Sequence, residues 1–123
     1  MTENESYNNY VKARQAMEEG DFPEAITLFQ DSLNASPHFK TYELLGTCLI
    51  ELGKIQEAIE ILSKGTAHYP TRFKTWYLLG EAYLSAQQPK EALSCWHQSV
   101  SINPQYHVAQ KRLREFSSMT GQN

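Results

Sequence analysis

The residues that most often carry chemistry are sparse in this sequence. Its two cysteines, Cys48 and Cys95, match neither a metal-binding pair nor a disulfide framework. No two of its four histidines have the i, i+4 spacing that places two metal ligands on one face of a helix. No nucleophile has an evident activating base, and no glycine-rich phosphate loop follows a strand. We therefore expect no enzymatic activity, no metal site and no cofactor.

Composition and charge narrow the class of protein. The chain has 123 residues, of which 41% are hydrophobic and 20% charged, as is usual for one globular domain. The net charge of −3 gives no basic surplus, so we expect no nucleic-acid partner. No apolar run is long enough to span a membrane. The polar, acidic start Met1–Glu5 does not resemble a secretory signal, which favours a cytoplasmic location.

A fixed period organises the elements that must position any functional side chain. Alanines at the same place in a recurring segment stand at Ala25, Ala58 and Ala92, which are 33 and 34 residues apart. Prolines follow in step at 37, 70 and 104. A period of this length indicates stacked units, each too small to bury its own apolar face.

Each unit has the apolar pattern of a helix, a turn and a second helix. In the second unit, Tyr42, Leu45, Leu49 and Leu52 form one helical stripe, and Gly53 ends it because glycine tolerates the left-handed conformation. Asp21 and Thr71 are expected to cap helices, and Pro23 and Pro89 to stand in first turns. The predicted helices cover about 5–19, 22–35, 39–52, 55–68, 72–86, 89–102 and 105–118.

Several residues inside these helices are interpreted as structural. Gly46 and Gly80 predict close helix crossings that leave no room for a side chain. Cys48, Trp76 and Trp96 are expected in the core, and Cys95 is expected to be partly exposed.

These motifs resemble those of the tetratricopeptide repeat (TPR) family. Tyr42-x-x-Leu45-Gly46-x-x-Leu49 and Trp76-x-x-Leu79-Gly80-x-x-Tyr83 match its first-helix signature. The resemblance implies an all-α, right-handed superhelix of about seven antiparallel helices forming one domain, 1–123. Its repeats would cover about 6–38, 39–72 and 73–106, followed by a capping helix at about 105–118 and a polar tail, 119–123.

The resemblance also implies a function: binding a partner protein or peptide in a concave groove lined by the first helix of each repeat. The positions that match the groove of the family hold tyrosines for amphipathic contacts and charged or polar residues for pairing. The candidate binding residues are Tyr7, Tyr10, Arg14, Lys40, Glu43, Thr47, Lys74, Tyr77, Glu81 and Lys111. A solvated face without a dedicated ligand is the plainer interpretation of the same residues.

Two further interpretations concern the partner. One TPR subclass holds the C-terminal carboxylate of chaperone partners, but only Lys74 matches its five charged or amide positions, so we do not expect that class. The other is self-assembly as a scaffold, with weak homo-oligomers. Residues 1–31 carry a net charge of −5 and residues 71–123 a net charge of +3, so opposite ends of a solenoid could stack.

Overall fold

The protein is an array of helices. The computed structural model describes residues 2–116 and 118, which form seven α-helices and no strand. This confirms the predicted all-α repeat fold. The predicted tail, 119–123, lies outside the described residues. The helices are α1 (Glu3–Glu18), α2 (Phe22–Ala35), α3 (Phe39–Glu51), α4 (Ile55–His68), α5 (Phe73–Ser85), α6 (Pro89–Ile102) and α7 (His107–Phe116).

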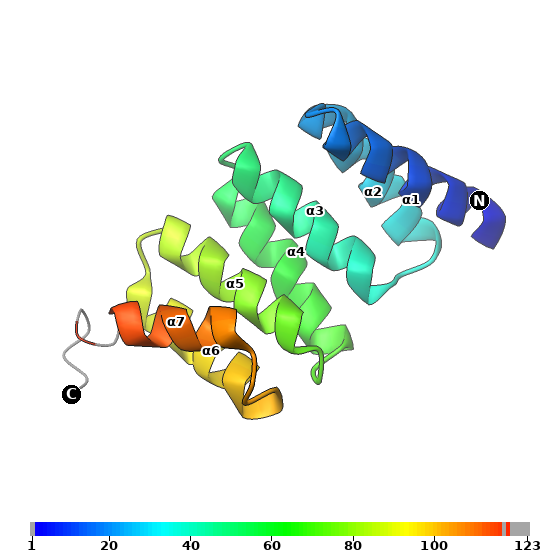
Figure 1. Cartoon of the computed structure of the whole chain (residues 1–123). Coiled ribbons are helices and arrows are strands. Elements are labelled where there is room, and N and C mark those ends of the chain that lie inside the picture. The colour runs from blue at the N-terminus through cyan, green and yellow to red at the C-terminus, as the bar shows by residue number, and fades with distance from the viewer. Residues whose placement is uncertain (1, 117, 119–123) are drawn as a thin grey trace.

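The helices pack in the order of the chain. Each one contacts the next, and α3 also contacts α5. Figure 1 shows the odd-numbered helices α1, α3, α5 and α7 in one layer and α2, α4 and α6 in a second layer behind them. The N-terminal and C-terminal helices lie at opposite ends of the array (Figure 1). We call the layer of odd-numbered helices the A face.

The turns inside the first two units follow from the sequence. Gly20 and Gly53 adopt left-handed backbone with φ of +81° and +76°, which glycine accepts at little steric cost. Asp21 caps α2, since its carboxylate accepts the backbone N–H of Glu24 at 3.3 Å. Pro23 stands in the first turn of α2, as predicted.

Helix starts differ from the prediction where a local hydrogen bond decides them. Helix α1 begins at Glu3 because the Thr2 hydroxyl accepts the backbone N–H of Glu5 at 3.2 Å. The expectation that Thr71 caps the fifth helix is wrong: Arg72 holds that position, and its side chain makes no capping hydrogen bond.

The last helix is shorter at its start than the predicted 105–118. The backbone N–H of Gln105 donates to the Asn103 side chain at 3.2 Å, and the N–H of Tyr106 donates to the Asn103 carbonyl at 3.1 Å. These bonds fold the segment into a turn, so α7 begins only at His107.

Gly46 and Gly80 mark close helix crossings, as predicted. A Cβ atom on Gly46 would lie 2.6 Å from Leu62 Cγ, and one on Gly80 would lie 2.7 Å from Trp96 Cδ1. Both distances are far shorter than a normal contact between side-chain atoms. In the second and third units, the second helix therefore packs directly against the backbone of the first.

The core contains most of the expected residues. Trp96, Cys48, Leu45 and Leu49 are fully buried, whereas Leu52, the last residue of its stripe, is 39% exposed. Trp76 is half-buried, and its indole N–H donates to the Pro70 carbonyl at 2.9 Å. The prediction that Cys95 is partly exposed is wrong, because its side of α6 packs into the core. None of the helices formed by the described residues is both long and apolar enough to cross a membrane.

Candidate functional site

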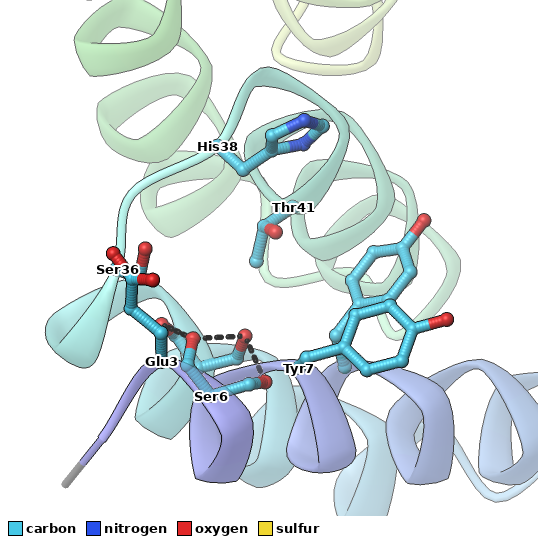
Figure 2. A pocket seen from close by; sticks show the side chains of 8 residues that line it. Glu3, Ser6, Tyr7, Ser36, His38 and Thr41 are labelled. Atoms are coloured by element: carbon cyan, nitrogen blue, oxygen red, sulfur yellow. Dashed lines mark hydrogen bonds between the residues drawn. The ribbon is translucent and has the colours of Figure 1, made fainter.

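A pocket opens on the A face where α1 and α3 lie beside each other. Its volume is about 220 Å³. Figure 2 shows Ser6 and Tyr7 of α1 on one side and Thr41 of α3, with His38 just before it, on the other. The complete lining is Glu3, Ser6, Tyr7, Tyr10, Ser32, Ser36, His38 and Thr41.

A pair of serines holds the α1 side of the pocket in place. The Ser6 hydroxyl donates to the Ser32 carbonyl at 2.8 Å, and the Ser32 hydroxyl donates to the Ser6 carbonyl at 2.8 Å. Both serines are buried, so these bonds satisfy groups that would otherwise be costly to bury. The reciprocal pair fixes α1 on α2 and sets the position of the neighbouring tyrosines.

Two of the predicted binding residues, Tyr7 and Tyr10, form the aromatic wall of this pocket. Their rings stack with a centroid distance of 6.4 Å, and Tyr10 also packs edge-on against the buried Phe29. Tyr7 is 65% exposed, and tyrosine is a residue type that protein interfaces favour. Arg14 continues the same face of α1 and lines a shallow hollow with both tyrosines.

The next contact between neighbouring A-face helices, the junction of α3 and α5, is closed by an ion pair whose carboxylate is buried. Glu43 is only 4% exposed. Its carboxylate accepts Arg72 Nε at 2.9 Å, Arg72 Nη2 at 3.3 Å and the Thr75 hydroxyl at 2.6 Å. The guanidinium of Arg72 also lies over the Phe39 ring, 4.3 Å from its centroid. Glu43 lies on the predicted helix, but its carboxylate is committed to joining α3 to α5 and is not free for a partner.

The third junction is closed in a similar way. Glu81 accepts Arg112 Nη2 at 2.7 Å and Nε at 3.0 Å, which ties α5 to α7. Tyr77 packs edge-on against Tyr106, with centroids 5.6 Å apart. Burial, helped by the Glu81 carboxylate, raises the pKa of the Tyr77 hydroxyl to about 12. Tyr77 and Glu81, two of the three predicted binding residues on α5, thus contribute to packing against α7 and the turn before it.

The predicted charges that remain free are all cationic. Arg14, Lys40, Lys74 and Lys111 are exposed, and none has an ion pair within the described part of the chain. Thr47 is half-buried, and its hydroxyl donates to the Glu43 carbonyl of its own helix at 2.9 Å. The A face therefore offers tyrosines and free bases, while its two predicted glutamates are neutralised internally.

The groups with catalytic potential are placed unfavourably for chemistry. Burial raises the pKa of the Cys48 thiol to about 11 and that of the Cys95 thiol to about 12, so neither is a thiolate near neutral pH. Among residues 2–116 and 118, no three His, Cys, Asp or Glu side chains gather to hold a metal ion.

The sequence prediction missed the polar half of the pocket. Ser6, Ser32, His38 and Thr41 were not among the predicted binding residues, yet all four line it. One signal in the sequence could have found Thr41. The tripeptide Phe39-Lys40-Thr41 recurs as Phe73-Lys74-Thr75, and the second copy binds the buried carboxylate described above.

Comparison with solved structures supports the fold over nearly the whole chain. The first TPR domain of Spaghetti (RPAP3), solved with the HSP90 peptide SRMEEVD, is 18% identical with a TM-score of 0.90, over 96% of this chain and 94% of that chain. The TPR domain of Arabidopsis OM64 is 21% identical with a TM-score of 0.83, over 92% and 97%. MamA of Desulfovibrio magneticus is 22% identical with a TM-score of 0.86, over 97% and 68%.

Sequence comparison gives the family. No curated protein sequence matches the chain. In contrast, the family model for the tetratricopeptide repeat matches residues 16–76 and 49–115, which together cover most of the chain. With the seven-helix repeat fold and the structural matches, this shows that the chain belongs to the tetratricopeptide repeat family.

Proposed function

We propose that this protein is a non-catalytic, cytoplasmic interaction module that binds a peptide or helix of a partner protein along its A face. The observation that carries the proposal is the open pocket between α1 and α3, where the strongly exposed Tyr7 stacks on Tyr10. Tyrosine is enriched at protein interfaces, so an exposed tyrosine beside a pocket favours a binding role. The structural relative solved with an HSP90 peptide shows that this fold can hold a peptide.

The binding surface that we propose differs from the one predicted from the sequence. Tyr7, Tyr10 and Arg14 on α1, together with the exposed Lys40, Lys74 and Lys111, remain candidate contacts. Glu43 and Glu81 form ion pairs within the protein, so we no longer propose them as partner contacts. Tyr77 is a secondary candidate, because its ring already packs against Tyr106.

Affinity capture with paired variants tests this function. Tyr7→Ala/Arg14→Ala removes two exposed A-face side chains, while Gln30→Ala/Lys64→Ala removes two exposed side chains of α2 and α4. We expect the first variant to lose partners that the second retains, because a few aromatic and arginine anchors usually carry most of an interface. Equal capture by both variants at unchanged helicity would contradict A-face binding.

End-to-end stacking is the competing function. The N-terminal and C-terminal helices lie at opposite ends of the array (Figure 1), and the opposite charge of residues 1–31 and 71–123 favours such stacking. The basic end is partly neutralised, since Arg112 pairs with Glu81 and Glu115, so stacking would depend on Lys111 and Arg114. Exposed pairs are screened by salt. Sedimentation should then show an oligomer that dissociates with added salt and with Arg114→Glu. A monomer at all salt concentrations would reject stacking.

A further inference from the structure

The first two junctions of the A face, between α1 and α3 and between α3 and α5, use corresponding sequence positions, but their hydrogen bonds differ. Thr41 and Thr75 are each the third residue of their helix, and both follow Phe-Lys. His38 and Arg72 hold the N-cap positions of the same two helices. Tyr10 and Glu43 correspond on the preceding A-face helices, each three residues before the small residue of the close crossing, Ala13 or Gly46. The second junction is therefore an internal template for the first.

In the template, the threonine has a carboxylate partner. The Thr75 hydroxyl donates to Glu43 at 2.6 Å, and Arg72 donates to both oxygens of the same carboxylate. A hydrogen bond to an ionised acceptor at this distance is among the stronger ones in proteins. The N-cap side chain and the third residue of α5 thus cooperate to hold one glutamate.

At the first junction the same hydroxyl has no partner. Thr41 is 2% exposed and lines the pocket, and within the described residues its hydroxyl makes no hydrogen bond (Figure 2). Tyr10, in the position of Glu43, supplies no carboxylate. The hydroxyl oxygen is reachable from the pocket, so water or a ligand there can satisfy it. The pocket lies where the template holds its glutamate.

His38 supplies a second donor. Its Nδ1 accepts the backbone N–H of Lys40 at 3.2 Å, which places the proton of the neutral ring on Nε2. His38 lines the pocket with its ring stacked on Phe39, so its Nε2 N–H is a donor at the rim of the pocket. The exposed, unpaired Lys40 lies next to Thr41 in the chain and adds positive charge at the rim.

We infer that the pocket between α1 and α3 binds the side-chain carboxylate of a glutamate from the partner, with Thr41 and His38 as its donors. The partner's glutamate would take the role that Glu43 has one repeat further on. This inference rests on the proposed A-face function and names the chemistry that one pocket of it recognises.

One charge in the lining opposes this ligand and provides a test. Glu3 lies at the end of the pocket beside Ser36 (Figure 2) and is exposed to solvent. Its repulsion of an incoming carboxylate is screened but not abolished. Replacing Glu3 with glutamine should therefore tighten binding of a glutamate ligand and leave binding of a glutamine ligand unchanged.

The experiment titrates the full chain with two blocked amino acids, N-acetylglutamate N-methylamide and its glutamine counterpart, and follows backbone amide shifts by NMR. The glutamate probe should shift Thr41 and His38 saturably, with a dissociation constant of roughly 1 mM, as expected for a ligand of this size. The glutamine probe should bind about tenfold more weakly, since it cannot accept charge-assisted bonds. Thr41→Val should weaken the glutamate probe by about as much, and Thr41→Ser should restore it.

Thr66→Val is the matched control, because it makes the same substitution at another buried threonine, on α4 and outside the pocket lining. It should leave the affinity of the glutamate probe unchanged. Equal binding of both probes at Thr41 would overturn the carboxylate inference while leaving a peptide-binding A face intact. Absence of saturable shifts at Thr41 and His38 would also overturn it, and the capture experiment would then decide the proposed function separately.

Discussion

The two equivalent threonines should respond differently to the same substitution: valine at position 75 should destabilise the protein, and valine at position 41 should not. Valine keeps the branched shape of threonine but lacks its hydroxyl, so Thr75→Val removes the 2.6 Å hydrogen bond to Glu43 with little change in packing. A hydrogen bond to a charged group contributes about 1.5–3 kcal/mol. Arg72 stays as a partner of Glu43, which places the expected loss near the lower end, at about 1.5–2 kcal/mol.

Thr41→Val should have almost no effect on stability. The Thr41 hydroxyl has no hydrogen bond to lose within the described residues, so the change should stay within about 0.5 kcal/mol. Each kcal/mol shifts the melting temperature by about 3–5 °C for a chain of this size. The Thr75 variant should therefore melt about 5–10 °C below wild type, and the Thr41 variant within about 2 °C of it.

Urea unfolding followed by circular dichroism measures both variants against wild type. The transitions should have similar slopes, so that a shift in midpoint reports stability alone. Equal losses for the two variants would refute the reasoning, because they would mean that Thr41 has an internal partner. An unchanged Thr75 variant would mean that the bond to Glu43 contributes nothing measurable.

Three further predictions concern the core. Gly80→Leu should destabilise the protein by about 1–3 kcal/mol despite the better helix propensity of leucine, because its side chain would overlap Trp96; a melting temperature equal to that of wild type would contradict the close crossing. The raised pKa values of Cys48 and Cys95 predict that Ellman's reagent labels neither thiol at pH 8 until urea unfolds the protein. Since only unfolded thiols ionise between about pH 9 and 11, stability should also fall as pH rises through that window, and less so in a variant with both cysteines replaced by alanine.

The fold could be predicted from the sequence because its signals repeat. Apolar stripes at helical spacing, turn glycines and first-turn prolines each recur with the period of the units. The details that the repeat pattern did not predict depend on local interactions. The Asn103 side chain folds the turn before α7. In the third unit, Gln87 adopts the left-handed conformation (φ +61°) that Gly20 and Gly53 adopt in the other two units.

For the candidate site, the sequence predicts only which residues share a helix face. The period places Tyr7, Tyr10 and Arg14 on one face, but it does not show which charges find partners across a junction. Glu43 meets Arg72, which is 29 residues away in the chain and has no distinctive spacing from it. The pocket itself depends on how widely α1 and α3 separate, and that distance is a property of packing rather than of either helix.

Site-specific photocrosslinking tests the central claim most directly, since it records what touches the A face. A benzoylphenylalanine replaces the exposed Tyr7 in one variant and the exposed Glu60 of α4 in a matched control. Irradiated with captured partners, the Tyr7→benzoylphenylalanine variant should form adducts that the Glu60→benzoylphenylalanine variant lacks. Adducts from the Glu60 position with none from the Tyr7 position would contradict the account and place the working surface on the layer of α2, α4 and α6.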